Sequence, residues 1–188
     1  MKAIPRSRYL LFFSLAAGGL AIDLVSKRWI FDRLEMPNHR PTEWLWKPVF
    51  GFTTNLNEGA LFGMGQGQVL LFAVLSIVAA AGILYWLFIS GAASDRLITV
   101  ALALVMGGIL GNLYDRLGMP GLVWDEYQPD HVTGAPVYAV RDWLNFALID
   151  WPIFNIADSL LVCGAGLLMV HAYWFDFKAE AKKPAAKA

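Results

Sequence analysis

Trp151-Pro-Ile-Phe-Asn-Ile-Ala-Asp-Ser159 opens the last long apolar segment of this 188-residue chain and places a carboxylate, that of Asp158, inside it. A charged side chain at membrane depth costs about 2.5 to 3.5 kcal/mol on the translocon scale, so a residue of this kind usually has a function. The residues that reach the same depth decide what that function is.

The composition of the whole chain is that of a membrane protein. Hydrophobic residues make up 57% of the sequence and charged residues 16%, against roughly 45 to 50% and 25% in soluble domains. The 15 basic and 15 acidic residues cancel, which leaves no polyanion-binding footprint and no nucleic acid as an expected partner. The single Cys163 excludes an intrachain disulfide. Without His or Cys pairs at ligand spacing, we expect no metal and no cofactor.

Four apolar segments are long enough, or nearly so, to cross a hydrocarbon core of roughly 30 Å as helices. They cover residues 9–25, 69–89, 97–113 and 153–175. The first resembles a signal peptide, because basic residues precede it, but no small-x-small cleavage site follows, so we expect it to remain as a span. The sequence therefore predicts one all-α membrane domain over residues 1–175, with a disordered cytoplasmic tail at 176–188.

The distribution of basic residues predicts the orientation of the four helices. The two termini and the short loop 90–96 hold 8 of the 15 Lys and Arg residues, whereas the two longer loops, 26–68 and 114–152, hold 7 over almost three times the length. Lys and Arg concentrate on the cytoplasmic side of a membrane. Both termini are therefore expected in the cytoplasm and both long loops outside.

The two long loops are too long to be simple connections. The first contains the run Phe50-Gly-Phe-Thr-Thr-Asn-Leu-Asn57, whose alternation of aromatic and polar residues before a glycine turn is typical of short strands. The second holds Trp124, Trp143 and Trp151, and indole rings favour the membrane–water interface. We expect a small extracytoplasmic β-sheet, a cradle, from the first loop and an interfacial outer loop from the second.

Polar residues from three spans are predicted to meet at one depth near the outer face. They are Asp23 and Lys27 at the end of the first span, Asn112, Asp115 and Arg116 at the end of the third, and Asn155 and Asp158 at the start of the fourth. Spacings of three and four residues place each set on one helical face. In isolation, the first set could be an interfacial ion pair, the second an ordinary helix end, and Asp158 a buried structural carboxylate.

Carboxylates are the plausible acid and base of such a layer. The sequence has no Gly-x-Ser-x-Gly or His-Glu-x-x-His motif, and its three histidines are scattered. Two aspartates held close together share a proton, so that one can deprotonate water while its protonated neighbour polarises a carbonyl group. Asp158 would need a second aspartate for this chemistry.

Four short boxes occur in order along the chain: Asp23-Leu-Val-Ser-Lys27, Asn57-Glu-Gly-Ala60, Gly107-Gly-Ile-Leu-Gly-Asn-Leu-Tyr-Asp-Arg116 and Phe154-Asn-Ile-Ala-Asp-Ser159. Together they resemble the signature motifs of bacterial lipoprotein signal peptidase (signal peptidase II). The resemblance implies an aspartic endopeptidase of the bacterial inner membrane, with its active site near the outer face, that removes the signal peptide from diacylglyceryl-modified prolipoproteins before the lipidated cysteine. It also implies inhibition by globomycin-like peptides. We further expect membrane lipids as partners and a monomer.

The resemblance implies a catalytic dyad of Asp158 and a second aspartate that usually lies shortly after the Asp-Arg pair, before an aromatic residue. This chain departs from that pattern because the segment from Asp115 to Asp158 is longer than the family pattern implies, so two aspartates are candidates for the second position. Asp125 lies 10 residues after Asp115, whereas Asp142 directly precedes an aromatic residue and lies 16 residues before Asp158. We favour Asp142, because an insertion at 118–136 would then fall in a solvent loop, and Asp125 stays the alternative.

The other box residues are implied to shape the site, hydrogen-bond the dyad and hold the substrate backbone. They are Asp23, Lys27, Asn57, Gly59, Asn112, Asp115, Arg116 and Asn155. The signal helix of the substrate is expected beside the first, third and fourth spans. The rival classes are a proton- or ion-coupled carrier, since intramembrane carboxylates also form proton relays, and a non-catalytic scaffold. Against the carrier, the carboxylates cluster at one face and no inverted repeat is obvious.

Overall fold

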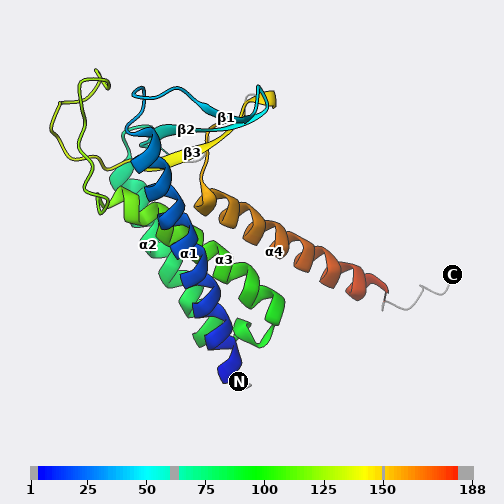
Figure 1. Ribbon diagram of the computed structural model, residues 1–188. Helices are drawn as coiled ribbons and strands as arrows, with labels where there is room; N and C mark the ends of the chain where they lie inside the picture. Colours follow the sequence, from blue (N-terminus) through cyan, green and yellow to red (C-terminus); the bar gives the residue numbers. More distant parts are fainter. Residues whose placement is uncertain (1–3, 60–63, 150, 182–188) are drawn as a thin grey trace.

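The computed structural model describes residues 4–59, 64–149 and 151–181, with side chains through Trp174. Its long helices are α1 (Arg6–Leu34), α2 (Val69–Leu84, extended by a π-helical turn, Tyr85–Ile89), α3 (Arg96–Arg116) and α4 (Ile156–Ala181). All four are long and apolar enough to cross a membrane, and a small sheet lies at one end of the bundle (Figure 1). The predicted four-helix membrane fold with a small sheet is confirmed.

Helix α1 continues well past the predicted end of the first span at residue 25. It runs to Leu34, so Asp23 and Lys27 do lie on one helix. Its last turns bury Ile30 and Phe31 in a cluster with residues of the sheet. The sheet supplies an apolar surface beyond the membrane, and this packing extends the helix into what was predicted as loop.

The sheet has three antiparallel strands in the order β1-β2-β3. Strands β1 (Glu43–Trp46) and β2 (Phe50–Asn57) come from the first loop, as predicted, but β3 (Val140–Phe146) comes from the second. The sheet was predicted from the first loop alone, so the contribution of β3 from the second loop is an addition to the prediction. Residues 140–144 are all buried, so β3 lacks the alternation that marks a half-exposed strand.

Helix α3 is the most buried of the four and packs against both α1 and α4. The Gly107-x-x-x-Gly111 pattern permits this contact: a Cβ at Gly107 would lie 3.1 Å from the carbonyl oxygen of Ala16, and one at Gly111 would collide with the carboxylate of Asp23. Small residues at such spacing let helix backbones approach closely. The two glycines therefore hold α1 against the end of α3 that carries Asn112 and Asp115.

Two boundaries differ from the prediction in α4. The helix begins at Ile156, three residues later than predicted, and continues to Ala181, six residues into the segment expected as a tail. Ala, Lys and Glu in this stretch are strong helix formers. Residues 182–188 lie outside the described part of the chain.

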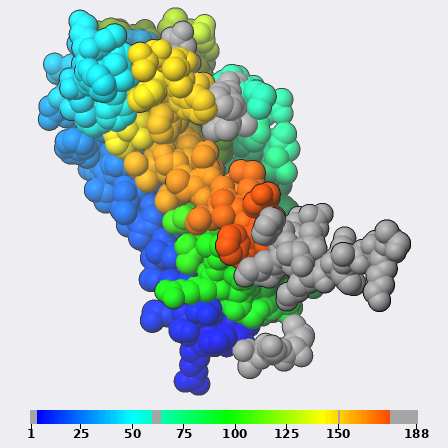
Figure 2. Space-filling model, turned by 90° about the vertical axis from the view of Figure 1, so that its right-hand side faces the viewer, coloured from blue at the N-terminus to red at the C-terminus, as the bar shows by residue number. Residues whose placement is uncertain are grey.

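Figure 2 shows the sheet capping the bundle above the helices.

The inserted segment 118–136 folds back against the chain that follows α1. Trp124 is buried in a cluster with Val137 and Ala139, and the Gln128 side-chain amide donates to the Pro37 carbonyl at 2.7 Å. The segment was predicted as a solvent loop, and much of it is exposed, but these contacts anchor it to the chain that follows the sheet end of α1.

Candidate active site

Helix α4 begins with a capping box made by Asn155 and Asp158. The Asn155 Oδ1 accepts the backbone N–H of Asp158 at 2.9 Å, and the Asp158 Oδ2 accepts the backbone N–H of Asn155 at 3.1 Å. A third free N–H of this helix end, that of Ala157, donates to Asp23 Oδ1 at 2.8 Å. These bonds satisfy the orphan donors of the helix end and hold Asp158 in the first turn, where the helix dipole stabilises an anion.

Strand β3 brings Asp142 to the same place. Its Cα pairs with that of Asn55 in β2, and the residue is 1% exposed. The Asn155 side-chain amide donates to Asp142 Oδ1 at 2.6 Å, and Asn57 also hydrogen-bonds this carboxyl. Asn155 therefore binds both aspartates: Asp142 through its side chain, and Asp158 through its backbone and side chain.

The two aspartates line one small cavity at the junction of the sheet with α3 and α4. Its volume is about 30 Å³, and Asn57, Asn112 and Arg116 are among its other lining residues. This is more space than a single water molecule requires. Asn112 donates from its amide to Asp158 Oδ1 at 2.8 Å. A water in this cavity would lie within reach of carboxylates and amides.

Burial raises the pKa of Asp142 to about 8, and the negative charge of Asp158 adds to the shift. The charge of Lys27 and hydrogen bonds from Asn155 and Asn57 act in the opposite direction but are smaller. The pair of Asp142 and Asp158 therefore retains a proton at neutral pH. Two close carboxyl groups that cannot both ionise readily are the arrangement used for acid–base chemistry by aspartic proteases.

Behind the aspartates lies a buried network of charges centred on Lys27. Its Nζ contacts Asp23 Oδ2 at 2.8 Å, Asp115 Oδ2 at 3.0 Å and Asn112 Oδ1 at 3.0 Å. Lys27, Asp23 and Asp115 are all 0% exposed. Two carboxylates and one amide oxygen thus surround the ammonium group, and such pairing is the condition for keeping a charge buried.

The sequence did not identify Arg141 as a site residue. The Asp115 carboxylate accepts from Arg141 Nε at 3.0 Å, from its Nη2 at 2.8 Å and from its backbone N–H at 3.0 Å. This clamp holds β3 at the residue directly before Asp142. One signal in the sequence could have indicated Arg141: it is a single basic residue in the otherwise mostly apolar run 137–144, directly before the candidate Asp142.

Comparison with known proteins decides the family. A family model described as signal peptidase (SPase) II matches residues 15–174. The chain belongs to the signal peptidase II family. The lipoprotein signal peptidase of Rhodopirellula baltica is 46% identical over 177 residues, which cover 91% of this chain and 75% of that protein. That of Halalkalibacterium halodurans is 29% identical over 178 residues, covering 94% and 100% of the two chains.

Two solved structures of bacterial membrane enzymes share the fold of this signal peptidase. One has a TM-score of 0.71 with 24% identity, covering 94% of this chain and 93% of that one. The other has a TM-score of 0.67 with 25% identity, covering 86% and 91%. The signal peptidase is thus an aspartic protease that spans the membrane several times and removes signal peptides from prolipoproteins, rather than a carrier or scaffold.

The remaining predicted site residues of the peptidase lie around the same cavity. Arg116 donates from Nη2 to the Gly59 carbonyl at 2.8 Å, with its guanidinium 5.5 Å from the Phe72 ring centroid. Asn57 accepts the Gly59 N–H at 2.9 Å. The second and third boxes are therefore joined at the rim of the cavity. Ala60, the last residue of the second box, lies outside the described residues.

Asp125, the alternative to Asp142, lies elsewhere in the peptidase. It is held in the inserted segment by His39, whose Nε2 donates to Asp125 Oδ2 at 2.8 Å. This hydrogen bond raises the pKa of His39. Asp125 is not among the residues that line the cavity with Asp158.

A larger groove leads from Asp158 along the membrane-spanning part of the peptidase. It has a volume of about 380 Å³, includes Asn112, Arg116 and Asp158 at one end, and is otherwise mostly apolar. A further apolar hollow continues it between α2, α3 and α4, sharing Ile109 and Leu161 with it. The groove can accept an apolar chain whose end reaches the aspartates.

Proposed function

We propose that this signal peptidase cleaves diacylglyceryl-modified prolipoproteins immediately before the lipidated cysteine, with Asp142 and Asp158 as its catalytic dyad. The observation that carries the proposal is the contact of Asn155 with both carboxyl groups: its side-chain amide donates to Asp142 Oδ1 at 2.6 Å, and its backbone N–H donates to Asp158 Oδ2 at 3.1 Å. This contact supports a fixed relative position of the two aspartates at the edge of a cavity large enough for a water molecule. The catalytic machinery belongs to one peptidase domain, residues 1–175.

The proposed reaction is acid–base hydrolysis without an acyl-enzyme. Asp142 holds the proton of the pair; it donates this proton to the scissile carbonyl oxygen as water attacks, and takes a proton back from the resulting diol when the C–N bond breaks. Asp158 takes a proton from water as the water oxygen attacks the carbonyl carbon. Asp158 then passes this proton to the amide nitrogen, and the C–N bond breaks to give a carboxyl group on the signal peptide and an α-amino group on cysteine.

The apolar groove is the proposed site of the signal helix. The groove lies between α2, α3 and α4. The sequence predicts the signal helix beside the first, third and fourth spans, so the proposed site has α2 in the place of α1. Arg116 and Asn57, at the rim of the dyad cavity, would hold the backbone beside the scissile bond. The buried residues next to the dyad would not touch the substrate but would fix the positions of the dyad and its neighbours; they are Asp23, Lys27, Asp115 and Asn155.

The same proposal includes the cellular setting. The excess of Lys and Arg beside the termini and the short α2–α3 connection supports cytoplasmic termini and an active site near the outer face of the bacterial inner membrane. The sheet would then lie outside and shield the unwound substrate from water and lipid. We propose that the enzyme acts as a monomer, among membrane lipids, and is inhibited by globomycin-like peptides.

The proposed function is tested by a gel-shift cleavage assay with a lipidated prolipoprotein and its unlipidated precursor. The purified enzyme is expected to shorten only the lipidated substrate, to leave cysteine as the new N-terminus, and to lose this activity with globomycin. Mass spectrometry of the product identifies the bond that is cut. Equal cleavage of both substrates, or a cut elsewhere, would contradict the proposal.

Cleavage is expected to decline as pH rises through about 8, because Asp142 then loses the proton that it must donate. Above this value kcat/KM should fall about tenfold per pH unit. The measurement is the pH profile of kcat/KM in a fixed lipid and detergent mixture, with circular dichroism as the control for folding. A profile that stays flat to roughly pH 10 would exclude a protonated Asp142 as the acid.

A further inference from the structure

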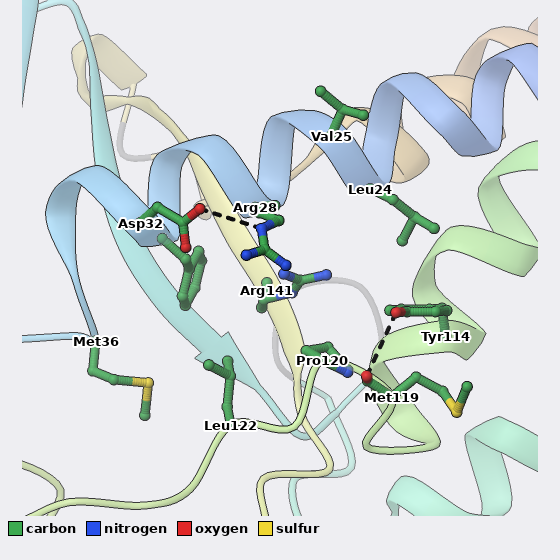
Figure 3. A pocket seen from close by; sticks show the side chains of 11 residues that line it. Leu24, Val25, Arg28, Asp32, Met36, Tyr114, Met119, Pro120, Leu122 and Arg141 are labelled. Atoms are coloured by element: carbon green, nitrogen blue, oxygen red, sulfur yellow. Dashed lines mark hydrogen bonds and ion pairs between the residues drawn. The ribbon is translucent and has the colours of Figure 1, made fainter.

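A separate cavity of about 410 Å³ lies between the outer ends of α1 and α3 and the start of the inserted segment. Figure 3 shows it with Arg28 of α1 and Arg141 of β3 among its walls. The residues found to line it do not line the dyad cavity. Its size falls in the range of small-molecule sites, roughly 300 to 1,000 Å³.

Arg141 is only 6% exposed and still lines the cavity. Its Nε and Nη2 are occupied by Asp115. Within the described part of the chain, no protein atom accepts a hydrogen bond from its third guanidinium nitrogen, Nη1. A buried guanidinium with a free N–H group at a cavity wall needs an acceptor from a ligand or from water.

Arg28 supplies a second cation from the other wall. Its Nε lies 3.3 Å from Asp32 Oδ2, and the two side chains are 80% and 66% exposed. An exposed ion pair of this kind is weak, so Arg28 can exchange Asp32 for another anion at little cost. The charged residues that line the cavity are Arg28, Asp32 and Arg141, and Asp115, the carboxylate that pairs with Arg141, does not line it.

The two arginines and the position of the cavity at the end of a membrane-spanning helix indicate which kind of ligand it would bind. Guanidinium groups bind phosphate through paired hydrogen bonds. Leu24 and Val25, which also line the cavity, belong to the membrane-spanning helix α1, and Val25 is 68% exposed. An anion that reaches Arg28 and Arg141 would therefore lie at headgroup level, with lipid chains beside these apolar residues.

We propose that this cavity binds the phosphate of an anionic membrane phospholipid, with the phosphate between Arg28 and Arg141 and an acyl chain along Leu24 and Val25. Because Arg141 directly precedes Asp142, a bound headgroup would tie β3 to the surface of the membrane. The site is distinct from the proposed signal-peptide groove and does not depend on the identity of the catalytic dyad.

Native mass spectrometry of the full chain, released from detergent micelles and titrated with phosphatidylglycerol or phosphatidylcholine, tests the proposal. One phosphatidylglycerol is expected to bind saturably, and Arg28→Gln should weaken it about tenfold, since one charge-assisted contact to phosphate is lost. Asp32→Asn should tighten binding, because it removes the anion that competes for Arg28. Phosphatidylcholine should bind more weakly, since its choline cation would meet the arginines.

Arg33→Gln is the matched control, because Arg33 lies on the same helix, pairs with Glu43 at 2.7 Å and does not line the cavity. It should leave phosphatidylglycerol binding unchanged. Equal binding in wild type, Arg28→Gln and Arg33→Gln, or no preference over phosphatidylcholine, would overturn the proposal. Inorganic phosphate that bound as tightly as the lipid would also overturn it, because the acyl contacts would then contribute nothing.

Discussion

Replacing Asp142 with Asn is expected to lower kcat/KM by about 10⁴-fold, since Asn cannot donate or recover the catalytic proton. Asp158→Asn should have an effect of the same order. In Asp142→Asn the side-chain oxygen can still accept the hydrogen bond from Asn155. In Asp158→Asn it can accept the one from Asn112, at the cost of the capping bond from the Asn155 backbone N–H. The loss should therefore be one of chemistry and not of folding, as measured by gel-shift cleavage alongside circular dichroism.

The Asp142→Asn variant should also respond differently to pH. The pKa of Asp142 is raised in the folded protein from its ordinary value of 3.8 to about 8, so between these values the folded state binds more protons than the unfolded state. Stability then falls as pH rises through this window. Asn does not titrate, and the variant should be at least as stable as wild type at pH 8 by thermal unfolding.

Asp125→Asn is the matched control for the dyad. Asp125 contacts His39 in the inserted segment and is remote from the residues that line the dyad cavity, so cleavage should stay within about threefold of wild type. If this variant were inactive while Asp142→Asn cleaved normally, the assignment of the dyad would be reversed. If both variants cleaved normally, the acid–base mechanism would be wrong.

Lys27→Met is expected to destabilise the fold by about 3 to 5 kcal/mol, because it leaves two buried carboxylates without their cation. Asp23 and Asp115 both lie within 3.0 Å of the Lys27 Nζ, and none of the three residues is exposed. Met matches the length of the lysine stem, so the change removes charge with little loss of volume. Equilibrium unfolding in mixed micelles measures the effect.

Arg28→Gln, at the next residue of α1, is the control for Lys27→Met. Its ion pair with Asp32 is exposed, and its removal should change the free energy of unfolding little. Adding Asp23→Asn to Lys27→Met should recover part of the lost stability, because one stranded carboxylate disappears. If Lys27→Met unfolded like the control, the charge network would not contribute to the fold.

The sequence by itself determined the membrane class, the four spans and the family. A run of about 20 apolar residues has few alternatives to a transmembrane helix, and four motifs in order are specific even though each is weak alone. The preference for Asp142 over Asp125 also came from the sequence, by placing the extra residues where a solvent loop could hold them. In the structure Asp142 lines one cavity with Asp158, and Asp125 does not; the assignment of the dyad stays a prediction.

Only the tertiary structure decided how the polar residues are paired. Strand β3 was missed because burial on both faces removes its alternation, and α1 was predicted too short because its last turns pack under a sheet that no local pattern revealed. The contacts that define the site join Ala157 to Asp23 and Arg141 to Asp115, which are 134 and 26 residues apart. Apolar length is a local property of a chain, whereas the partner of a buried charge depends on which segments the fold brings together.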